Sequence, residues 1–352
     1  MKTGEQRWAA GLSGDHEIAE HFSDNTLFAS FSRFESALIN GLAKAGLIAS
    51  ADAEDLVRQI GDFVPDGAAI AEAGVRDGVP VPEYVRQLRA HVGGPAKPML
   101  HHGATSQDLM DTATIEALIS VNAILAERLE KLMEQLSSLS ARCGRNGLQA
   151  ITRMQPAIMF RASDRIAAWR QPLMALRDRL SQLEEQTRVL QLGGAVGDLQ
   201  VLGENAEVVA QSIAQELGLH WPEHSWHSAR SPVLAQANFM CELTGTLGKI
   251  GQDVALMALR GGDDIRMSGG GSSSAMPHKQ NPVTAERLVT LARFNATLVS
   301  GMHQAQIHEM ERSGAAWMLE WMILPQMCET AGASLLAAIA LVQSIENMGE
   351  PA

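Results

Sequence analysis

The chain has 352 residues, which is long enough for a sizeable hydrophobic core and for two domains. Aromatic residues make up only 4% of it, while Ala and Leu are the most frequent residues and Met, Glu and Gln add further helix formers, so the composition favours helix over strand. A formal net charge of −12 excludes bulk attraction to nucleic acid or to an anionic membrane, and an anionic substrate would therefore need a locally basic pocket.

The cysteines and the apolar segments bear on the cellular compartment. Cys143, Cys241 and Cys328 are far apart and odd in number, which argues against a disulfide framework and fits a reducing environment. The first 22 residues are polar and charged, without the apolar centre of a signal peptide, and the apolar run 331–342 is too short to span a bilayer. We therefore expect a soluble cytoplasmic protein.

Proline spacing indicates how the chain is organised. Prolines cluster up to residue 98 and are rarer afterwards, and because proline breaks helices, the long proline-free stretches predict very long helices. No convincing run of alternating residues predicts strands. We expect an all-α fold with a short-helix N-terminal domain over 1–100, a long-helix bundle over 101–345 with a catalytic loop at 262–282, and a short tail at 346–352.

Two stretches show the helical pattern directly. The segment 233–260 predicts one helix of roughly 40 Å at 1.5 Å per residue. In an earlier segment, apolar residues recur at steps of three or four, as one buried face of a helix requires. They are Leu118, Val121, Leu125, Leu129, Leu132, Leu136 and Leu139.

The segment 101–112 reads His-His-Gly-Ala-Thr-Ser-Gln-Asp-Leu-Met-Asp-Thr. Thr105 or Ser106 can cap a helix, with Asp108 as the capping-box partner, and the helix start then presents N–H groups and hydroxyls to a carboxylate. His101 lies just upstream and has a side chain suited to proton transfer. The alternative is an ordinary cap with two incidental histidines.

Two later arginines are candidate anion ligands. Arg230 follows Trp226 and His227 and could bind a substrate carboxylate through its forked guanidinium, although a solvated surface arginine is the alternative. Arg312 could be a second anion ligand, and a surface ion pair is the competing interpretation.

The segment 269–282 reads Gly-Gly-Gly-Ser-Ser-Ser-Ala-Met-Pro-His-Lys-Gln-Asn-Pro. Three glycines and three serines predict a mobile loop whose backbone N–H groups can turn toward an anion. The ammonium group of Lys279 and several N–H donors would lower the pKa of a nearby serine hydroxyl and stabilise developing negative charge. The alternative, a plain Gly/Ser linker, does not account for the Met-Pro-His-Lys-Gln-Asn-Pro that follows.

These motifs resemble those of the fumarase/aspartase superfamily. The loop matches Gly-Ser-Ser-x-Met-Pro-x-Lys-x-Asn-Pro with one extra serine, and 101–112 matches His-x-Gly-x-Thr-Ser-x-Asp-x-x-Asp-Thr at every fixed position. A third motif, Thr-His-x-Gln-x-Ala, is met by Thr152 and Gln155, but Arg153 stands where many members have a proton-transferring histidine. Arginine stays protonated and cannot shuttle a proton, which puts the usual lyase acid in doubt.

Within the superfamily the chain most resembles the bacterial 3-carboxy-cis,cis-muconate cycloisomerases, of class II, which also lack that histidine. The resemblance runs from about Phe22 to Pro325. It implies a small anionic substrate and a homotetramer whose central helices form a twenty-helix core, with each active site shared among three subunits. It also implies that the superfamily's C-terminal domain is shortened or missing.

The resemblance assigns roles to individual residues. Ser274 would exchange the substrate proton, Lys279 and Asn281 would stabilise enolate-like charge, and His101 would take part in catalysis. No metal and no organic cofactor are implied. The other expected substrate-binding residues are Thr105, Ser106, Thr152, Arg153, Gln155, Arg230, Ser273, Met276 and Arg312.

Three alternatives stay open from the sequence. A 3-sulfo analogue could replace the carboxylated substrate, because both groups are compact anions. An adenylosuccinate or argininosuccinate lyase of the same fold would instead release fumarate. A catalytically silent helical scaffold would keep the fold without the reaction.

Overall fold

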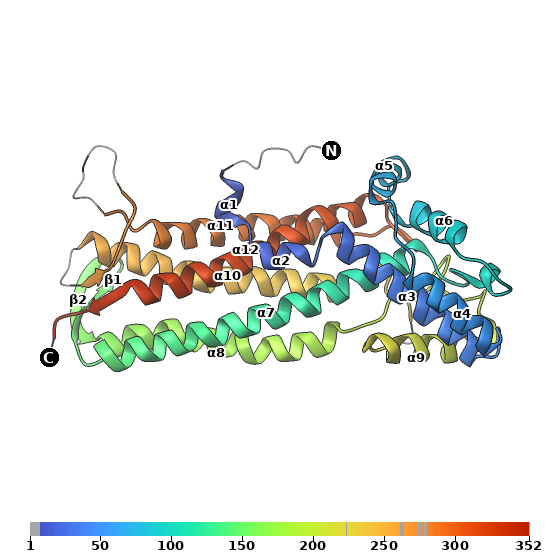
Figure 1. Cartoon of the computed structure of the whole chain (residues 1–352). Coiled ribbons are helices and arrows are strands. Elements are labelled where there is room, and N and C mark those ends of the chain that lie inside the picture. Colours follow the sequence, from blue (N-terminus) through green and yellow to red (C-terminus); the bar gives the residue numbers. More distant parts are fainter. Residues whose placement is uncertain (1–7, 223, 261–263, 273–275, 277–279, 352) are drawn as a thin grey trace.

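Five long helices form the body of the structure, a computed structural model that describes residues 8–222, 224–260, 264–272, 276 and 280–351 (Figure 1). They lie roughly side by side along one axis, and most of the shorter N-terminal helices gather toward one end of the bundle. The five are α7 (Ser106–Cys143), α8 (Ala162–Thr187), α10 (Ser231–Leu259), α11 (Val283–Ala305) and α12 (Ala315–Ser344). The all-α prediction is confirmed.

Helix α7 runs the length of the bundle. Its 38 residues correspond to about 57 Å at 1.5 Å per residue. The predicted leucine-rich stripe, Leu118 to Leu139, is buried at every position, where α7 packs against α8, α12 and α3 (Asp24–Lys44). Each fully buried leucine contributes about 1.5–3 kcal/mol relative to an exposed one, so this stripe is the reason that a helix of such length is stable.

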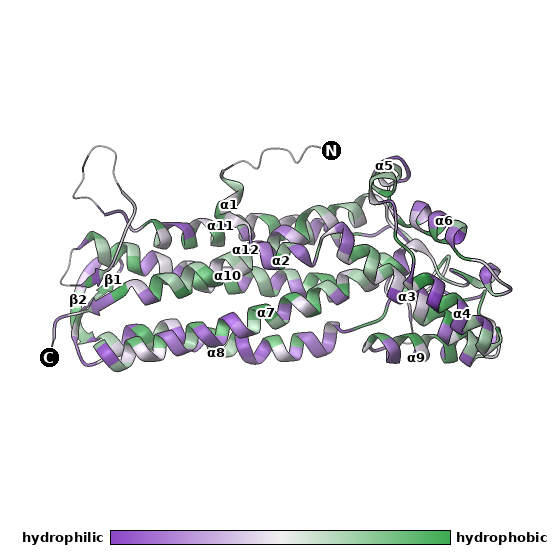
Figure 2. Cartoon of the chain, in the orientation of Figure 1, coloured by the Kyte–Doolittle hydropathy of each residue, from purple (hydrophilic) through white to green (hydrophobic). Residues whose placement is uncertain are grey.

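Helices α10 and α11 approach closely because two glycines face the contact. A Cβ on Gly248 would meet Ala292 at 2.5 Å, and one on Gly251 would meet the carbonyl oxygen of Ala285 at 2.5 Å. Helix α10 covers 231–259, so the predicted helix over 233–260 is confirmed. In Figure 2 hydrophobic residues follow α10, whereas α8 carries many hydrophilic ones.

The N-terminal part consists of shorter helices around an aromatic cluster. The rings of Phe28, Phe31 and Phe63 pack on Tyr84, which is fully buried. Helix α9 (Ala206–Leu217) also packs on α3, so a segment from the later half of the chain covers this part. The division at residue 100 stays a prediction. The remaining helices are α1 (Ala10–Ser13), α2 (His16–Glu20), α4 (Ser50–Gly61), α5 (Gly67–Asp77), α6 (Val81–His91), η1 (Lys97–Met99) and η2 (Gly203–Asn205).

Two short antiparallel pairs of strands were not predicted. Strands β1 (Gly147–Thr152) and β2 (Gln155–Arg161) form a hairpin, and β3 (Ile265–Met267) pairs with β4 (Ile345–Met348). Most residues of β2 are exposed, so the alternation of buried and exposed side chains that marks a strand is missing. The expectation of a chain without strands was therefore wrong for these segments.

Prolines also stand inside two long helices. Pro172 lies within α8 and Pro325 within α12, although proline was expected to end helices. A proline in a helix interior costs about 3 kcal/mol. Both helices continue on either side of the proline because their apolar residues are buried in the bundle.

Helices α7 and α12 are long and apolar enough to cross a membrane by length and composition alone. However, 61% of the most apolar window of α7 and 72% of that of α12 are buried inside the structure. This burial is what the central helices of a bundle require.

The glycine contact between α10 and α11 predicts an asymmetry between two substitutions in one helix. Gly251→Ala should lower the free energy of unfolding by about 1–3 kcal/mol, because its Cβ would overlap backbone atoms. Gly245→Ala, where nothing lies within 4 Å, should instead raise it by about 0.5–1 kcal/mol. Chemical denaturation of the two variants checks this, and equal effects would contradict the packing argument.

Candidate active site

The first group of predicted site residues surrounds the start of α7. Thr105 is the N-cap residue, and its backbone N–H donates to Oδ2 of Asp108 at 2.9 Å, so the predicted cap with Asp108 as partner is confirmed. Thr105 and Ser106 are half-buried. The first N–H groups of this 38-residue helix have no intrahelical partner, and such a helix start stabilises an anion.

Asp108 also fixes the loop beside this helix start. Its carboxylate accepts the backbone N–H groups of Gly193 at 2.9 Å and Gly194 at 3.0 Å, and Oδ1 lies 2.8 Å from Nε2 of His227. A Cβ on Gly194 would lie 2.9 Å from the carbonyl oxygen of Gly103, so the two glycines let the loops touch. The sequence showed Asp108 only as a capping residue.

His101 lies in the turn before α7 and is bound by a residue that sequence reasoning missed. Its Nδ1 lies 2.6 Å from Oε1 of Glu35, and its backbone N–H donates to Oε2 of the same carboxylate at 3.0 Å. Burial lowers the pKa of His101, but the charge and hydrogen bond of Glu35 outweigh it, so the pKa lies above its ordinary value. The imidazolium form therefore persists to higher pH than in an exposed histidine.

Arg312 lies beside the same helix start. Its Nε donates to Oε1 of Gln107 at 2.9 Å, and Nη2 donates to the carbonyl oxygen of Ala195 at 3.1 Å. These partners are neutral, so the guanidinium keeps its positive charge near Thr105 and Ser106. The structure thus brings together His101, Thr105, Ser106 and Arg312, as an anion site would require.

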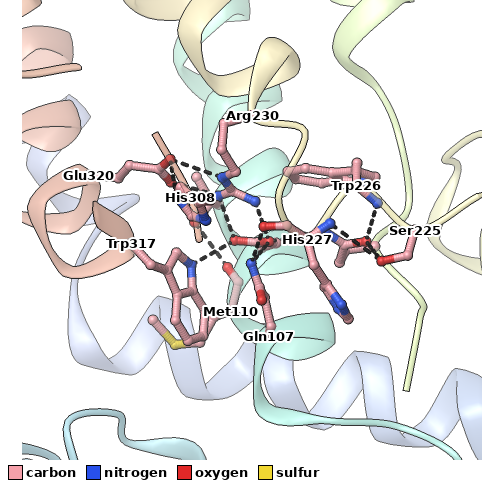
Figure 3. Close-up of polar contacts among 12 residues, drawn as sticks. Gln107, Met110, Ser225, Trp226, His227, Arg230, His308, Trp317 and Glu320 are labelled. Atoms are coloured by element: carbon pink, nitrogen blue, oxygen red, sulfur yellow. Dashed lines mark hydrogen bonds and ion pairs between the residues drawn. The ribbon is translucent and has the colours of Figure 1, made fainter. Parts of the chain in front are cut away.

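Arg230, at the N-cap of α10, is in a different environment from the open anion site expected for it (Figure 3). Its guanidinium donates to both oxygens of Asp111, at 2.7 and 2.9 Å, and to both oxygens of Glu320, at 2.9 and 2.6 Å. The side chain is 2% exposed. The guanidinium is therefore already bound by two carboxylates of its own chain. Its role is to hold the neighbouring site residues in position.

Further side chains donate hydrogen bonds to Asp111. We call the set formed by Asp111, Arg230, Glu320, Trp317, Gln107 and Gln191 the Arg230 cluster. Trp317 donates its Nε1–H to Oδ1 at 3.0 Å, and the amides of Gln107 and Gln191 each donate to Oδ2 at 3.1 Å. Burial raises the pKa of Asp111, but the charge of Arg230 and these hydrogen bonds hold it below the ordinary value. The cluster joins α7, α10, α12 and the loop at Gln191.

The second group of predicted residues lies on the hairpin. Thr152 and Gln155 are paired across β1 and β2, and both are exposed, as is Arg153. Arg153 and Met154 form the turn with φ values of 48° and 63°, in the left-handed region that costs a non-glycine residue about 1–3 kcal/mol. Strain of this kind is common at functional sites.

A cavity of about 650 Å³ adjoins the hairpin turn. Four of its lining side chains are cations, namely Arg153, Arg165, Lys249 and Arg260. Lys249 pairs with Asp253 and Arg260 with Asp264, while Arg165 lies over the ring of Phe160. The lining also contains those two carboxylates, so its four cations are only partly neutralised and the cavity keeps a positive charge.

The described residues on either side of the glycine- and serine-rich loop lie at the same end of the bundle as the hairpin (Figure 1). The two sides of this loop are joined by a backbone bridge, since the N–H of each of Gly271 and Asn281 donates to the carbonyl oxygen of the other, at 2.9 and 3.0 Å. Met276 is exposed. The predicted Ser273, Ser274 and Lys279 lie outside the described residues.

The two groups of residues lie at opposite ends of the bundle. Helix α7 begins at the end of the bundle that holds His101, and the hairpin directly follows its other end. The 38 residues of α7 span about 57 Å. A small substrate bound near Thr105 therefore cannot reach Arg153 of the same chain. In the described ranges, no three His, Cys, Asp or Glu side chains are grouped so as to hold a metal ion.

A bundle of long helices with cationic side chains near both ends is a fold of the fumarase/aspartase type. The chain belongs to the lyase family, whose sequence model matches residues 18–296. The predicted superfamily resemblance is thereby confirmed.

Relatives refine the placement within this family. The 3-carboxy-cis,cis-muconate cycloisomerase of Pseudomonas aeruginosa is 34% identical over 331 residues, which are 92% of this chain and 72% of that protein. The enzyme of that name from Bradyrhizobium diazoefficiens is 33% identical over 319 residues, 89% of this chain and 71% of that protein. The crystal structure of the 3-carboxy-cis,cis-muconate lactonizing enzyme from Pseudomonas putida has a TM-score of 0.88 at 30% identity, covering 96% of this chain and 77% of that one. The predicted resemblance to this branch is confirmed.

The Arg230 cluster predicts a large and pH-dependent effect of Asp111→Asn. Removing one carboxylate from a buried ion cluster should cost about 3–5 kcal/mol of unfolding free energy at neutral pH. Because the pKa of Asp111 is lowered in the folded state, its contribution is fully present above the ordinary value of 3.8 and is lost as pH falls through the lowered pKa. The difference in unfolding free energy between wild type and variant should therefore become smaller below about pH 4.

Chemical denaturation at several pH values measures this difference. Asp178→Asn is the matched control, because Asp178 is an exposed carboxylate paired with Arg177 and its loss should change stability by less than about 0.5 kcal/mol. Equal effects of the two substitutions would contradict the role given to the Arg230 cluster.

Proposed function

We propose that the chain is a cycloisomerase, an intramolecular lyase that interconverts 3-carboxy-cis,cis-muconate and its carboxymuconolactone in the cytoplasmic breakdown of aromatic compounds, the protocatechuate or β-ketoadipate route. The observation that carries the proposal is the similarity to enzymes of that name over about nine-tenths of the chain. Arg153 in place of the usual lyase histidine supports the same choice. The substrate is a small trianion, which suits the separate cationic groups at the two ends of the bundle.

We infer that the working form is a homotetramer in which each active site combines three subunits. The distance along α7 supports this, because a small substrate can meet both groups of residues only if they come from different chains. Apolar side chains near the hairpin, including Met154, Ile158 and Leu259, are strongly exposed in the single chain. Their burial against neighbouring subunits would remove apolar surface from water.

The reaction needs only the substrate and one proton, which solvent supplies through the acid group and takes back in the reverse direction. In lactonisation, a carboxylate oxygen forms a C–O bond to one carbon of a double bond, and the electron pair moves to the carbon beside another carboxylate. The resulting enolate-like charge is neutralised when a proton is delivered to that carbon. Because the reaction is intramolecular, much of the acceleration comes from holding carboxylate and alkene in reacting geometry.

We assign the proton transfer to Ser274, as acid in lactonisation and as base in the reverse direction. Lys279, Asn281 and the loop N–H groups would stabilise the enolate-like charge, with Ser273 and Met276 lining the same side. Arg153, with Thr152 and Gln155, would hold one carboxylate. His101, Thr105, Ser106 and Arg312 would hold another, with Arg230 orienting them through Asp111.

Direct assays separate this function from its rivals. Turnover of 3-carboxymuconate, compared side by side with the 3-sulfo analogue, tests the substrate, and the sulfo compound is a second candidate because it carries the same compact charge. Fumarate release from adenylosuccinate or argininosuccinate would favour a lyase of the other branches. Binding of a tricarboxylate without turnover of any of these compounds would favour a silent scaffold.

Substitutions in the loop test the catalytic assignments. Ser274→Ala should lower kcat by about 10²–10⁴-fold through loss of the acid–base group. Lys279→Met should cost about 3–4 kcal/mol of transition-state stabilisation, as loss of an oxyanion donor does. The decrease in muconate absorbance measures both, and the neighbouring Ser272→Ala serves as the control that should leave kcat near wild type. Undiminished turnover by an assembled Ser274→Ala enzyme would overturn the serine assignment.

Sharing of the site among subunits predicts complementation. Co-expression of His101→Ala with Ser274→Ala should restore roughly a quarter of wild-type activity, because random assembly gives about one site in four with both intact motifs. Co-expression of His101→Ala with Thr105→Ala is the matched control and should restore none, since those two residues share one segment of one chain. Equal activity from the two mixtures would rule out a shared site.

A further inference from the structure

We propose that Glu35 is a positioning residue that holds His101, by both its ring and its backbone, as a cationic donor toward a substrate carboxylate. The inference rests on the proposed function for its substrate, but the contact between the two residues stands on the structure alone. Glu35 lies on α3, far in sequence from the motifs that identify the family, and no sequence pattern indicated a role for it.

One carboxylate, that of Glu35, contacts both the ring and the backbone of His101, and we call this pair of contacts the Glu35 clamp. Oε1 lies 2.6 Å from Nδ1 of His101, and Oε2 accepts the His101 backbone N–H at 3.0 Å. His101 has φ at 60°, in the left-handed region that a non-glycine residue occupies only when its surroundings compensate. The hydrogen bond to the backbone N–H provides such compensation, so Glu35 fixes the direction in which the side chain leaves the turn.

Burial makes this pair mutually dependent. Glu35 is 0% exposed and lies in a stretch of α3 whose neighbours, including Phe31, Phe34 and Leu38, are equally buried. An isolated carboxylate there would be strongly destabilising unless paired. Among the described residues, His101 is the partner that forms an ion pair with it. The energetics therefore favour His101 as the imidazolium.

Three charged groups act on the ring. Glu35 from α3 and Asp108 from α7 favour the cation, while Arg89 from α6 opposes it. Arg89 donates to the carbonyl oxygen of Leu100 at 3.1 Å and so is held near the same turn. The two carboxylates prevail over Arg89 and burial, which is why the pKa of His101 is raised.

The geometry then decides what the ring can do. With Nδ1 bonded to Glu35, the opposite edge of the imidazole carries Nε2–H, and the side chain is 15% exposed. An imidazolium with one nitrogen already bound donates one charge-assisted hydrogen bond through the other. His101 precedes the N-cap Thr105 by four residues, so the turn that carries the ring adjoins the start of α7. His101 is thus assigned to binding a substrate carboxylate, and the proton transfer remains with the serine loop.

The first test measures the histidine itself and does not depend on turnover. Deuterium exchange at the imidazole Cε1–H, followed by mass spectrometry of the whole protein after digestion, gives the titration midpoint of each histidine. His101 should titrate above the ordinary histidine value of 6.5, and Glu35→Gln should move its midpoint down by about one pH unit or more. Glu35→Asp, which keeps the charge, should restore part of the shift. An unchanged midpoint in Glu35→Gln overturns the proposal.

The second test measures catalysis with the same variants. In the wild type, kcat/KM for 3-carboxymuconate should fall as pH rises through the His101 pKa. In Glu35→Gln that fall should begin at lower pH, mainly through a higher KM, because binding of a carboxylate is what is lost. Glu116→Gln is the matched control, since Glu116 pairs with Arg33 and Ser30 instead of a histidine and its loss should leave the pH profile unchanged.

The two tests distinguish failure of the proposed function from failure of the Glu35 proposal. A shifted His101 midpoint without muconate turnover would overturn the proposed function and leave the Glu35 clamp standing. Turnover with an unchanged midpoint and pH profile in Glu35→Gln would overturn the clamp alone. If Glu35→Gln does not fold, Glu35→Asp carries both measurements, and a profile identical to the wild type despite the shorter side chain, with no change in the midpoint, would count against the proposal.

Discussion

The bonding of Arg230 between Asp111 and Glu320 is the interaction on which one whole end of this bundle depends. A buried guanidinium or carboxylate is costly unless it is paired, so α7, α10 and α12 must meet where these three side chains can reach one another. Gln107 and Gln191 extend the cluster to the start of α7 and to the neighbouring loop. The groups that would bind an anion there are consequently positioned by this network of buried hydrogen bonds and ion pairs.

The length of α7 imposes the second constraint. A rod of 38 residues separates the histidine turn from the hairpin and the serine loop, and no bending of a packed helix brings them together. The strained turns at His101, Arg153 and Met154 lie at these two ends, and strain in non-glycine residues accumulates where function requires it. The proposed sharing of the active site among chains would let both ends contact one substrate.

Much of the fold and part of the site could be predicted from local pattern. The stripe from Leu118 to Leu139 and the cap at Thr105 depend on neighbours in sequence, and both were predicted correctly. The strands at 147–161 were missed because β2 is exposed on both faces. That a helix can continue through Pro325 could not be predicted either, because the cost of a proline is local whereas the burial that offsets it is not visible in the sequence. Arg230 read as an open ligand because its two carboxylates lie 119 and 90 residues away in the chain.

The sequence by itself determined which chemical groups are present and which of them belong to one motif: the serine loop, the segment 101–112 and the arginine at position 153. Only the tertiary structure decided their partners. Glu35 became the partner of His101, Asp108 joined a cap to a glycine loop, and Arg230 was withdrawn from solvent. The physical reason is that helix caps and apolar stripes are local, whereas the charge state and orientation of a buried group are set by residues that only folding brings near.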